Sequence, residues 1–399
     1  MLSSLKVRNF RLYWIGMFIS LIGTWVQSVA QSWLVFRLTN SAFLLGLVGF
    51  LSYVPVFLLS LFGGVVADRM NKKSILLFTQ GAFMVLALFL AVLTQIELIT
   101  ASCIMFIAVL NGIVMAFDAP SRQAVVVELS GREHLFNAVT LNSVAFNASR
   151  IIGPALAGIF IASIGMSGCF YINAISFLPF IIILLSIRIN NNPRTSRNNT
   201  VVRDLIAGLK VIRNNRLILA LITMVGVSSL FGVSYIILMP IFAEQVLNVG
   251  AKGLGVLMSS SGLGALIAAL FLAGLGEFKH RGRLLVISSI VFSLALILFS
   301  LSKAYLLSII ALALIGWGSV TAIAIINTLL QTVVSDEFRG RVMSVFMFTF
   351  AGFMPFGNLI AGSLSGVLGV SFTVMLSGII CTIFFIVINI LYPDIRRQL

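Results

Sequence analysis

The chain has 399 residues, of which 60% are hydrophobic and only 9% are charged, and its mean hydropathy is +1.14. Soluble domains are about 45–50% apolar and about 25% charged, so this composition excludes a soluble enzyme, a secreted disulfide scaffold and a disordered protein. A net charge of +15 would favour nucleic-acid binding in a soluble protein. Here the basic residues lie between apolar runs, where they orient helices in a bilayer. The composition therefore predicts a polytopic membrane protein without a nucleic-acid partner.

The sequence shows no metal site and no nucleotide site. Cys103, Cys169 and Cys381 lie in separate apolar runs, and His134 and His280 lie in polar loops without a second ligand at helical spacing. There is no Gly-x-x-x-x-Gly-Lys-[Ser/Thr] loop. We therefore expect no catalytic residues, no metal and no cofactor.

Apolar runs bounded by charge, Gly or Pro predict twelve membrane-spanning helices. They cover residues 11–36, 43–67, 74–95, 98–120, 137–164, 168–189, 216–241, 251–275, 283–302, 304–328, 342–368 and 370–392. The first run is too long for the apolar part of a signal peptide, so we interpret it as a span with its N-terminus in the cytoplasm. With that orientation 22 of the 26 Lys and Arg residues fall on the cytoplasmic side, which is the positive-inside pattern. Both termini are thus predicted to be cytoplasmic.

The longest polar stretch, residues 190–215, divides the chain into two groups of six spans, 1–189 and 216–399. Within it, residues 201–213 have apolar side chains at helical spacing, which predicts a short amphipathic helix on the cytoplasmic face. The stretch is therefore interpreted as a cytoplasmic linker between two six-helix bundles.

The two halves are related in sequence. Three glycines recur 204 residues later: Gly153, Gly158 and Gly165 correspond to Gly357, Gly362 and Gly369. This offset predicts two parallel repeats of six helices. Pro154 and Pro355 occupy near-equivalent places and permit kinks, and Gly362 with Gly366 allows close helix contact. Tight packing is the simpler interpretation of these residues, and a rocking contact is the alternative.

The loop after the second span reads Gly64-Val-Val-Ala-Asp68-Arg69-Met-Asn71-Lys72-Lys73. It resembles the signature Gly-x-x-x-Asp-Arg-x-Gly-Arg-Arg that the major facilitator superfamily has in the same loop. Together with the six-plus-six repeat, the resemblance covers essentially the whole chain. It implies an all-α fold of two six-helix bundles that works by alternating access. Asn71 stands where the family has Gly, and we expect it to keep the turn by adopting a positive φ.

The resemblance implies a gating role for this loop. Its residues would tie spans two and three to the cytoplasmic end of span eleven, where a helix N-terminus favours a carboxylate. The gating candidates are Gly64, Asp68, Arg69, Lys72 and Lys73 in the loop, with Asp336, Arg339 and Arg341 before span eleven. The alternative is that these charges only fix the topology.

Three further stretches are similar to the bacterial exporter branch that includes the enterobactin exporter. They are Arg11-Leu-Tyr-Trp14 with Gly23-Thr-Trp25-Val-Gln27, then Ser149-Arg150-Ile-Ile-Gly153-Pro154-Ala-Leu-Ala-Gly158, and Gly340-Arg341-Val-Met-Ser344. The resemblance implies efflux of siderophore-like or drug-like molecules, with the proton gradient as energy source. The drug-antiporter pattern Gly-x-x-x-Gly-Pro-x-x-Gly-Gly is matched only in part, so export is implied more directly than proton antiport.

By the same resemblance, spans one, four, seven and ten line the central path. Polar side chains there are candidates for substrate contact, because unsatisfied polar atoms are expensive in hydrocarbon. They are Trp25, Gln27, Gln31, Asn111, Asp118, Tyr235, Trp317, Asn327 and Gln331. Helix–helix hydrogen bonding is the alternative for each uncharged member.

Two charged residues lie inside predicted spans. Arg150 is near the middle of span five, where a lone Arg costs about 2.5–3.5 kcal/mol or more, so it should face a cavity or a partner. Asp118 has Arg122 four residues later as its best-placed partner. An Asp between two Arg would hold its charge and carry protons poorly. A structural or gating pair, proton coupling through Asp118 and contact of Arg150 with an anionic substrate all remain open.

The sequence thus predicts a multi-pass exporter of the cytoplasmic (inner) membrane, whose partners are a small-molecule substrate and membrane lipid. We expect a monomer. An importer or lipid transporter on the same fold is the main alternative, since fold does not determine function. A membrane sensor or scaffold is disfavoured because the chain has no large soluble domain.

Overall fold

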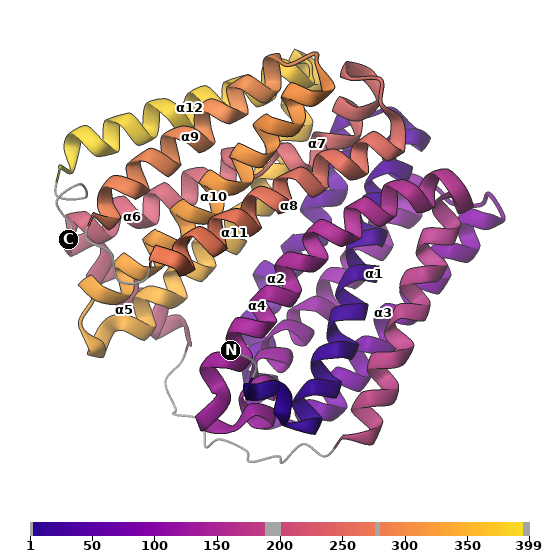
Figure 1. Cartoon of the computed structure of the whole chain (residues 1–399), viewed down its shortest axis with the longest axis horizontal. Helices are drawn as coiled ribbons and strands as arrows, with labels where there is room; N and C mark the ends of the chain where they lie inside the picture. The colour runs from indigo at the N-terminus through magenta and orange to yellow at the C-terminus, as the bar shows by residue number, and fades with distance from the viewer. Residues whose placement is uncertain (1–2, 188–200, 276–279, 394–399) are drawn as a thin grey trace. The chain divides into compact units, whose positions relative to one another are not determined.

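The computed structural model describes residues 3–187, 201–275 and 280–393 (Figure 1). All regular structure in those residues is helical. Eleven helices in the described ranges are long and apolar enough to cross a membrane. The chain forms two compact units. Unit 1 is Met1–Asn40, Leu51–Arg197 and Ala251–Gly255, and unit 2 is Ser41–Phe50, Asn198–Gly250 and Val256–Leu399.

The described residues of the first half of the chain form five helices, in which α1 and α3 both pack against α4 (Figure 1). They are η1 (Ser3–Lys6), α1 (Arg8–Thr39), α2 (Ala42–Arg69), α3 (Lys72–Gln95) and α4 (Ala101–Ser186). Two glycines with positive φ interrupt α4, Gly131 (φ 68°) and Gly165 (φ 77°). Glycine is suited to this left-handed region because it has no Cβ. The α4 helix is therefore three helical segments in succession.

The predicted fifth and sixth spans both fall in one apolar helix, Glu133–Ser186, of 54 residues. At about 1.5 Å per residue such a helix is about 80 Å long, well over twice the length that one bilayer crossing needs. Gly165 divides it where the predicted spans 137–164 and 168–189 meet. This is why the structure has eleven candidate spans where the sequence predicts twelve.

Ten helical elements lie in residues 201–275 and 280–393. They are α5 (Val201–Asn214), α6 (Arg216–Val227), η2 (Ser228–Gly232), α7 (Tyr235–Ile241), η3 (Phe242–Val246), α8 (Gly250–Leu275), α9 (Arg281–Leu301), α10 (Tyr305–Val333), α11 (Asp336–Leu368) and α12 (Val370–Leu391). The helix α5 lies at residues 201–213, where a short helix is predicted. From α6 to η3 the chain is one candidate span, Arg216–Val246, with π-helical turns at η2 and η3.

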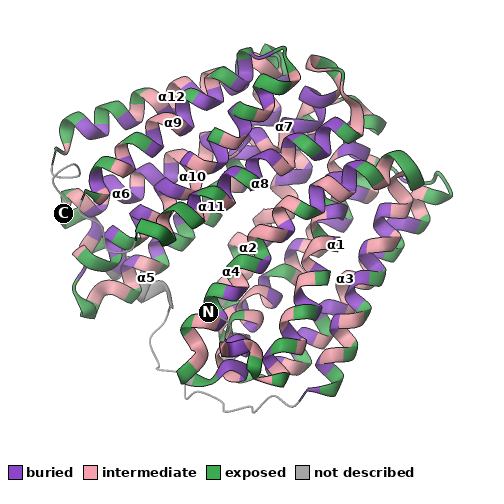
Figure 2. Ribbon diagram, in the orientation of Figure 1, coloured by how far each residue is buried: buried purple, intermediate pink, exposed green. Residues whose placement is uncertain are grey.

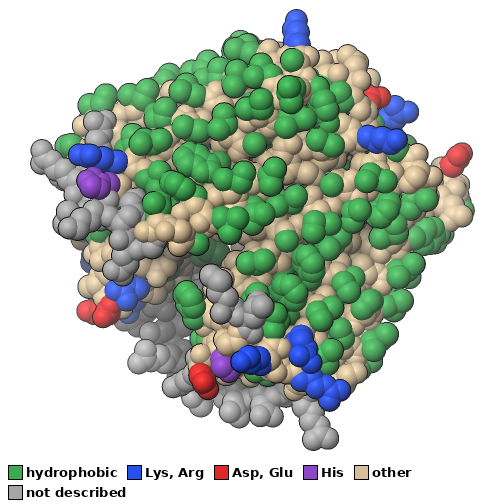
Figure 3. Space-filling model, in the orientation of Figure 1, with side chains coloured by type: hydrophobic (Ala, Val, Ile, Leu, Met, Phe, Trp, Pro, Cys, Tyr) green, Lys and Arg blue, Asp and Glu red, His purple; other side chains and the backbone are tan. Residues whose placement is uncertain are grey.

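Apolar side chains cover both the inside and the outside of the helices. In unit 1, Phe10, Tyr13, Leu76 and Phe180 are fully buried in one core cluster, and Figure 2 shows buried residues along the faces where helices meet. In Figure 3 hydrophobic side chains are spread over the whole visible face, and the charged side chains lie near its edges. This distribution is expected of helices whose outer faces contact lipid.

The repeated glycines have equivalent environments in the two halves. Gly165 and Gly369 both have positive φ, 77° and 82°. A Cβ on Gly158 would lie 3.2 Å from the Cα of Gly255, and one on Gly362 would lie 2.7 Å from the Cα of Gly46. Gly46 precedes α8's Gly255 by 209 residues, an offset close to the 204 of the other pairs. The sequence repeat therefore corresponds to repeated helix crossings.

Several predictions differ from the structure. The predicted loop 121–136 is helical except at Gly131, because the helix of span four continues past its apolar part.

Asn71 has φ −64° and caps α3, accepting a bond from the amide of Ser74 at 3.2 Å. The expected positive φ is therefore wrong, and Asn is used as a favoured N-cap. Nothing lies within 4 Å of a Cβ on Gly366, so only Gly362 makes the expected close contact. The first part of the predicted linker, residues 190–200, lies outside the described residues.

Candidate transport site

A buried cluster of polar side chains joins α3 and α4 in unit 1. One carboxylate oxygen of Asp118 accepts hydrogen bonds from Thr79 Oγ1 at 2.8 Å and from Gln80 Nε2 at 2.7 Å. Its other oxygen pairs with Nε of Arg122 at 2.5 Å. Asp118 is only 6% exposed. We call Thr79, Gln80, Asp118 and Arg122 the Asp118 cluster.

Arg122 also connects this cluster to α1. Its guanidinium lies over the ring of Phe180, 4.9 Å from the centroid, and its backbone carbonyl accepts a bond from the Tyr13 hydroxyl at 3.4 Å. Within the described residues, its Nη1 is buried without a hydrogen-bond partner. The Arg122 guanidinium thus contacts one carboxylate and one aromatic face. Its Nη1 donor has no hydrogen-bond partner among the described residues.

The lysines of the loop signature bind partners within unit 1. Lys72 is buried and forms an ion pair with Glu128 of α4. Lys73 Nζ donates to the carbonyls of Leu185 at 3.0 Å and Ile187 at 2.9 Å, where a helix C-terminus favours a cation. These contacts connect the start of α3 to the end of the first segment of α4, before Gly131, and to the end of α4.

The other members of the loop signature make fewer described contacts. Arg69 is exposed, and a Cβ on Gly64 would meet nothing within 4 Å. The side chain of Asp68 lies outside the described residues. Before α11, Arg339 forms an ion pair with Asp336 at 2.6 Å, and Arg341 lies over the ring of Phe338 at 5.5 Å.

The candidate path residues of α1 and α4 fall into two groups. Gln27 is 8% exposed and accepts a bond from Asn173 Nδ2 at 2.7 Å, so it joins two helices. Trp25, Gln31, Asn111 and Arg150 are half-buried. Trp25 packs edge-on against Phe146 at 6.2 Å, and it lies beside Gly153, where an added Cβ would overlap the Trp25 Cβ. These half-buried residues are the better candidates for substrate contact.

In unit 2 the candidate path residues are separated. The Tyr235 hydroxyl lies 2.9 Å from Ser261 Oγ in the interior. Trp317 packs against Phe271 at 6.1 Å. Gln331 is exposed near the end of α10, donates to Asn327 at 2.6 Å and accepts at its carbonyl from Arg339 at 2.9 Å. The pair Asn327–Gln331 therefore belongs to the helix end next to α11.

The helix-breaking residues lie inside continuous helices. Pro154 and Pro355 are both buried, within α4 and α11. Gly357 lies so close to Leu230 of η2 that an added Cβ would overlap its carbonyl oxygen. Gly153 and Gly357, 204 residues apart, thus each allow a close approach to another helix.

Sequence reasoning missed Thr79, Gln80 and Asn173, because it examined only the four spans expected to line the path. A polar pair in the middle of an apolar run, Thr79-Gln80, is the signal that could have found them. It also missed Asn358, a 4% exposed side chain of α11 that lies next to Gly49.

Comparison with known proteins identifies the family. Residues 1–396 match the family model MFS_3, described as transmembrane secretion effector. The chain belongs to this family of the major facilitator superfamily. The MFS_3 proteins are membrane transporters and not enzymes, and this chain is accordingly a multi-pass membrane protein.

Two relatives match the chain nearly end to end. A staphyloferrin A transporter of Staphylococcus aureus is 28% identical over 93% of this chain and 94% of its own length. The enterobactin exporter EntS of Citrobacter koseri is 24% identical over 99% of this chain and 95% of its own. Among solved structures, a bacterial homologue of the lysosomal transporter Spinster superposes with a TM-score of 0.72 at 13% identity, covering 98% of both chains. The nucleoside transporter NupG gives a TM-score of 0.73 at 13% identity, covering 96% of this chain and 99% of its own. These neighbours confirm the major facilitator fold.

Proposed function

We propose that this protein exports small, anionic, siderophore-like molecules across the cytoplasmic membrane. The observation that carries the proposal is the end-to-end similarity to relatives named for staphyloferrin A and enterobactin. A shared fold alone would not suffice, because transporters of unlike substrates have it. We infer twelve spans with both termini cytoplasmic, since division at Gly165 yields the twelfth span and basic residues then concentrate on one side.

The charge of Arg150 supports an anionic substrate. It is half-buried near the middle of an apolar helical segment, where a cation is retained only against a cost. Its guanidinium presents a planar fork of donors that matches a carboxylate or a catecholate oxygen pair. We propose that Arg150, with Trp25 and Gln31 of α1, contacts the substrate. Asn111 of α4, which is also half-buried in unit 1, is a further candidate for this contact.

Alternating access would use the glycine crossings. Each of the pairs Gly46–Gly362 and Gly158–Gly255 brings two helix backbones together without intervening side chains. Such contacts close tightly and separate without breaking hydrogen bonds. We propose that they part in one half of the cycle, and that the loop residues with Asp336, Arg339 and Arg341 close the opposite end.

Coupling to protons would require rearrangement of the Asp118 cluster. Both carboxylate oxygens of Asp118 accept hydrogen bonds, and an ionised carboxylate can only accept. A proton on Asp118 would therefore have to displace Arg122 or one of the two neutral donors. We propose that protonation releases Arg122, whose Nη1 already lacks a partner among the described residues.

The test is substrate-induced proton release from acid-loaded inside-out vesicles. The panel is iron-free enterobactin, iron-free staphyloferrin A, a lipophilic cation and an amphiphilic anion. We expect the two siderophores to release protons and to accumulate inside the vesicles. Uptake only into right-side-out vesicles would make the protein an importer. If transbilayer lipid movement were the only activity, siderophore export would be wrong. Accumulation without proton release would leave export standing and remove proton coupling.

A further inference from the structure

The helix α1 has two exposed faces of opposite character. Thr24 and Ser28 are exposed near its middle, and the half-buried Gln31 continues the same face, because residues three and four apart are neighbours on a helix. Ile15 and Ile19 are 43% and 39% exposed. Each precedes Thr24 or Ser28 by nine residues, which is about two and a half turns, so the isoleucines lie on the opposite face. Isoleucine suits contact with lipid, whereas hydroxyl and amide groups in mid-membrane need water or a ligand.

The second segment of α4, between Gly131 and Gly165, has the same division. Ser143 is exposed, and the half-buried Asn147 and Arg150 follow it four and seven residues later on the same face. Ile152 and Ile159 are 39% and 54% exposed. They follow Ser143 and Arg150 by nine residues, so they too lie on the face opposite the polar one. Each helix thus presents one polar and one apolar exposed face.

These two helices lie side by side and run in the same direction. Trp14 of α1 donates from Nε1 to the carbonyl of Leu141 at 2.9 Å. Farther along both helices, Trp25 lies beside Gly153, where an added Cβ would be 2.4 Å from the Trp25 Cβ. Because the contacts advance together along both helices, α1 and this segment of α4 are parallel.

The parallel arrangement places both polar faces on the same side of the helix pair. Ser28 follows the contact residue Trp25 by three residues, whereas Arg150 precedes the contact residue Gly153 by three residues. At about 100° per residue, these steps turn away from the contact by about 60° in opposite senses. Since the contact sides of the two helices face each other, opposite turns bring Ser28 and Arg150 to one side. We call the six residues on this side the polar wall: Thr24, Ser28, Gln31, Ser143, Asn147 and Arg150.

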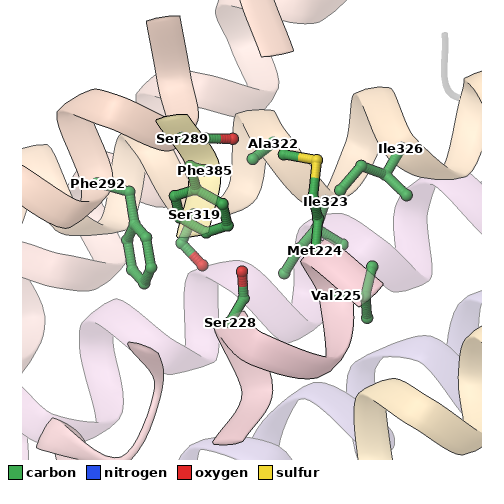
Figure 4. A pocket seen from close by; sticks show the side chains of 10 residues that line it. All are labelled: Met224, Val225, Ser228, Ser289, Phe292, Ser319, Ala322, Ile323, Ile326 and Phe385. Carbon is green, nitrogen blue, oxygen red and sulfur yellow. The ribbon is translucent and has the colours of Figure 1, made fainter. Parts of the chain in front are cut away.

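The polar wall combines one cation with three hydroxyls and two amides. A guanidinium binds two oxygens of an anion through parallel donors, and hydroxyl and amide groups donate to or accept from further oxygens. The pocket of unit 2 in Figure 4 offers no such set, because its ten lining residues are all uncharged and most of them are apolar. Among these two places, the chemistry for an anion with several oxygens is therefore found on the polar wall of unit 1.

We propose that the polar wall binds the negatively charged, oxygen-rich part of the transported molecule. Arg150 pairs with the charged group, and Ser28 and Asn147 hydrogen-bond to oxygens beside it. This inference rests on the proposed export of siderophore-like anions. It adds to that function the side of the helices that the ligand occupies, and the contact residues Thr24, Ser28, Ser143 and Asn147.

Cysteine labelling tests which side of the helices faces water. In a Cys103→Ser background the two remaining cysteines are buried. Ser28→Cys and Ile19→Cys form a matched pair, because both positions are equally far from the middle of α1. A charged methanethiosulfonate reacts with the thiolate, which apolar surroundings suppress, so in nanodiscs Ser28→Cys should react about tenfold faster or more. Asn147→Cys and Ile152→Cys repeat the comparison on α4. Equal rates within both pairs would overturn the polar wall.

Protection from labelling tests the ligand. We expect citrate and iron-free enterobactin to slow the labelling of Ser28→Cys several-fold, and tetraphenylphosphonium to leave it unchanged. If siderophores are transported but neither anion protects, the binding role of the wall is wrong and the proposed function stands. If citrate protects but no siderophore is transported, the wall stands and the proposed function is wrong. Protection by the lipophilic cation alone would overturn the assignment to an anion.

Discussion

At the scale of single residues, the Asp118 cluster combines a buried ion pair with neutral hydrogen-bond donors in unit 1. Asp118 and Arg122 are four residues apart on α4, so they share a helix face. Their burial raises the strength of the pair and also the penalty for leaving either charge alone. Neutral donors from α3 complete the carboxylate's shell. The cluster therefore joins α3 to α4 and also neutralises two buried charges on α4.

We expect Asp118→Asn to lower the free energy of unfolding by about 3 kcal/mol, since it leaves the buried Arg122 without a counter-charge. The double variant Asp118→Asn/Arg122→Gln should recover most of that loss, which a double-mutant cycle in detergent denaturation would measure. The control is Asp336→Asn, whose partner is Arg339 but whose side chain is 87% exposed; we expect no measurable change there. Equal stability of Asp118→Asn and wild type would show that the two charges are not coupled.

The position of Arg150 leads to a separate prediction about the charge of the substrate. If its guanidinium binds an anionic group, Arg150→Gln should weaken siderophore binding about 10- to 100-fold, because a charged hydrogen bond contributes about 1.5–3 kcal/mol. Arg150→Lys should lie between, since it keeps the charge and loses the fork. Lys303→Gln, at an exposed position, is the matched control for loss of one positive charge. Binding measured by fluorescence quenching in detergent would refute this role if Arg150→Gln bound as tightly as wild type.

At the scale of helices, close packing depends on glycines whose surroundings differ. An added Cβ would overlap Trp25 at Gly153 and Leu230 at Gly357, whereas at Gly81 of α3 it would meet nothing within 4 Å. We expect Gly153→Ala and Gly357→Ala to lower the Tm, because each pushes two helices apart. Gly81→Ala should raise stability by up to about 1 kcal/mol through helix propensity alone. Thermal unfolding of the three variants checks this, and a uniform gain would disprove the close approaches.

The start of α3 provides a prediction of its own. Asn71 caps the helix with its side chain, so Asn71→Ala should cost about 1 kcal/mol and Asn71→Ser almost nothing. Asn71→Gly should cost a few tenths of a kcal/mol. A gain in Tm for Asn71→Gly would instead indicate that the position needs a positive φ.

The presence of each helix could be predicted from the local composition. Which helices contact one another could not be predicted in this way. Apolar run length is a property of neighbouring residues, so the spans and the amphipathic helix at 201–213 follow from the sequence. The break at Gly165 coincides with a predicted loop, and the helix through 121–130 was missed because polarity was taken as the end of a helix. The bonds of Asp118 to Thr79 and Gln80 depend on which face of α3 meets α4. That contact joins residues far apart in the sequence, so the spacing of side chains within one helix does not predict it.

At the scale of the whole molecule, two helices are shared between the compact units. The first part of α2, Ser41–Phe50, belongs to unit 2, and its continuation from Leu51 belongs to unit 1. The first residues of α8, Ala251–Gly255, belong to unit 1, and the rest belongs to unit 2. The two helix ends that belong to the other unit are thus at equivalent positions in the two repeats. The glycine crossings Gly46–Gly362 and Gly158–Gly255 lie at these helix ends.

The crossing at Gly362 predicts the effect of a large side chain placed between α2 and α11. A Cβ on Gly362 would lie 2.7 Å from the carbonyl oxygen of Ala42, while one on Gly366, a turn later on α11, would meet nothing within 4 Å. If transport requires the α2–α11 contact to close once per cycle, Gly362→Leu should hold it open and abolish vesicle uptake. Substrate binding should persist, because the wedge lies outside the proposed binding residues. Gly366→Leu should transport at the wild-type rate. Normal uptake by a correctly folded Gly362→Leu would mean that this crossing stays fixed or tolerates separation, and that alternating access uses other contacts.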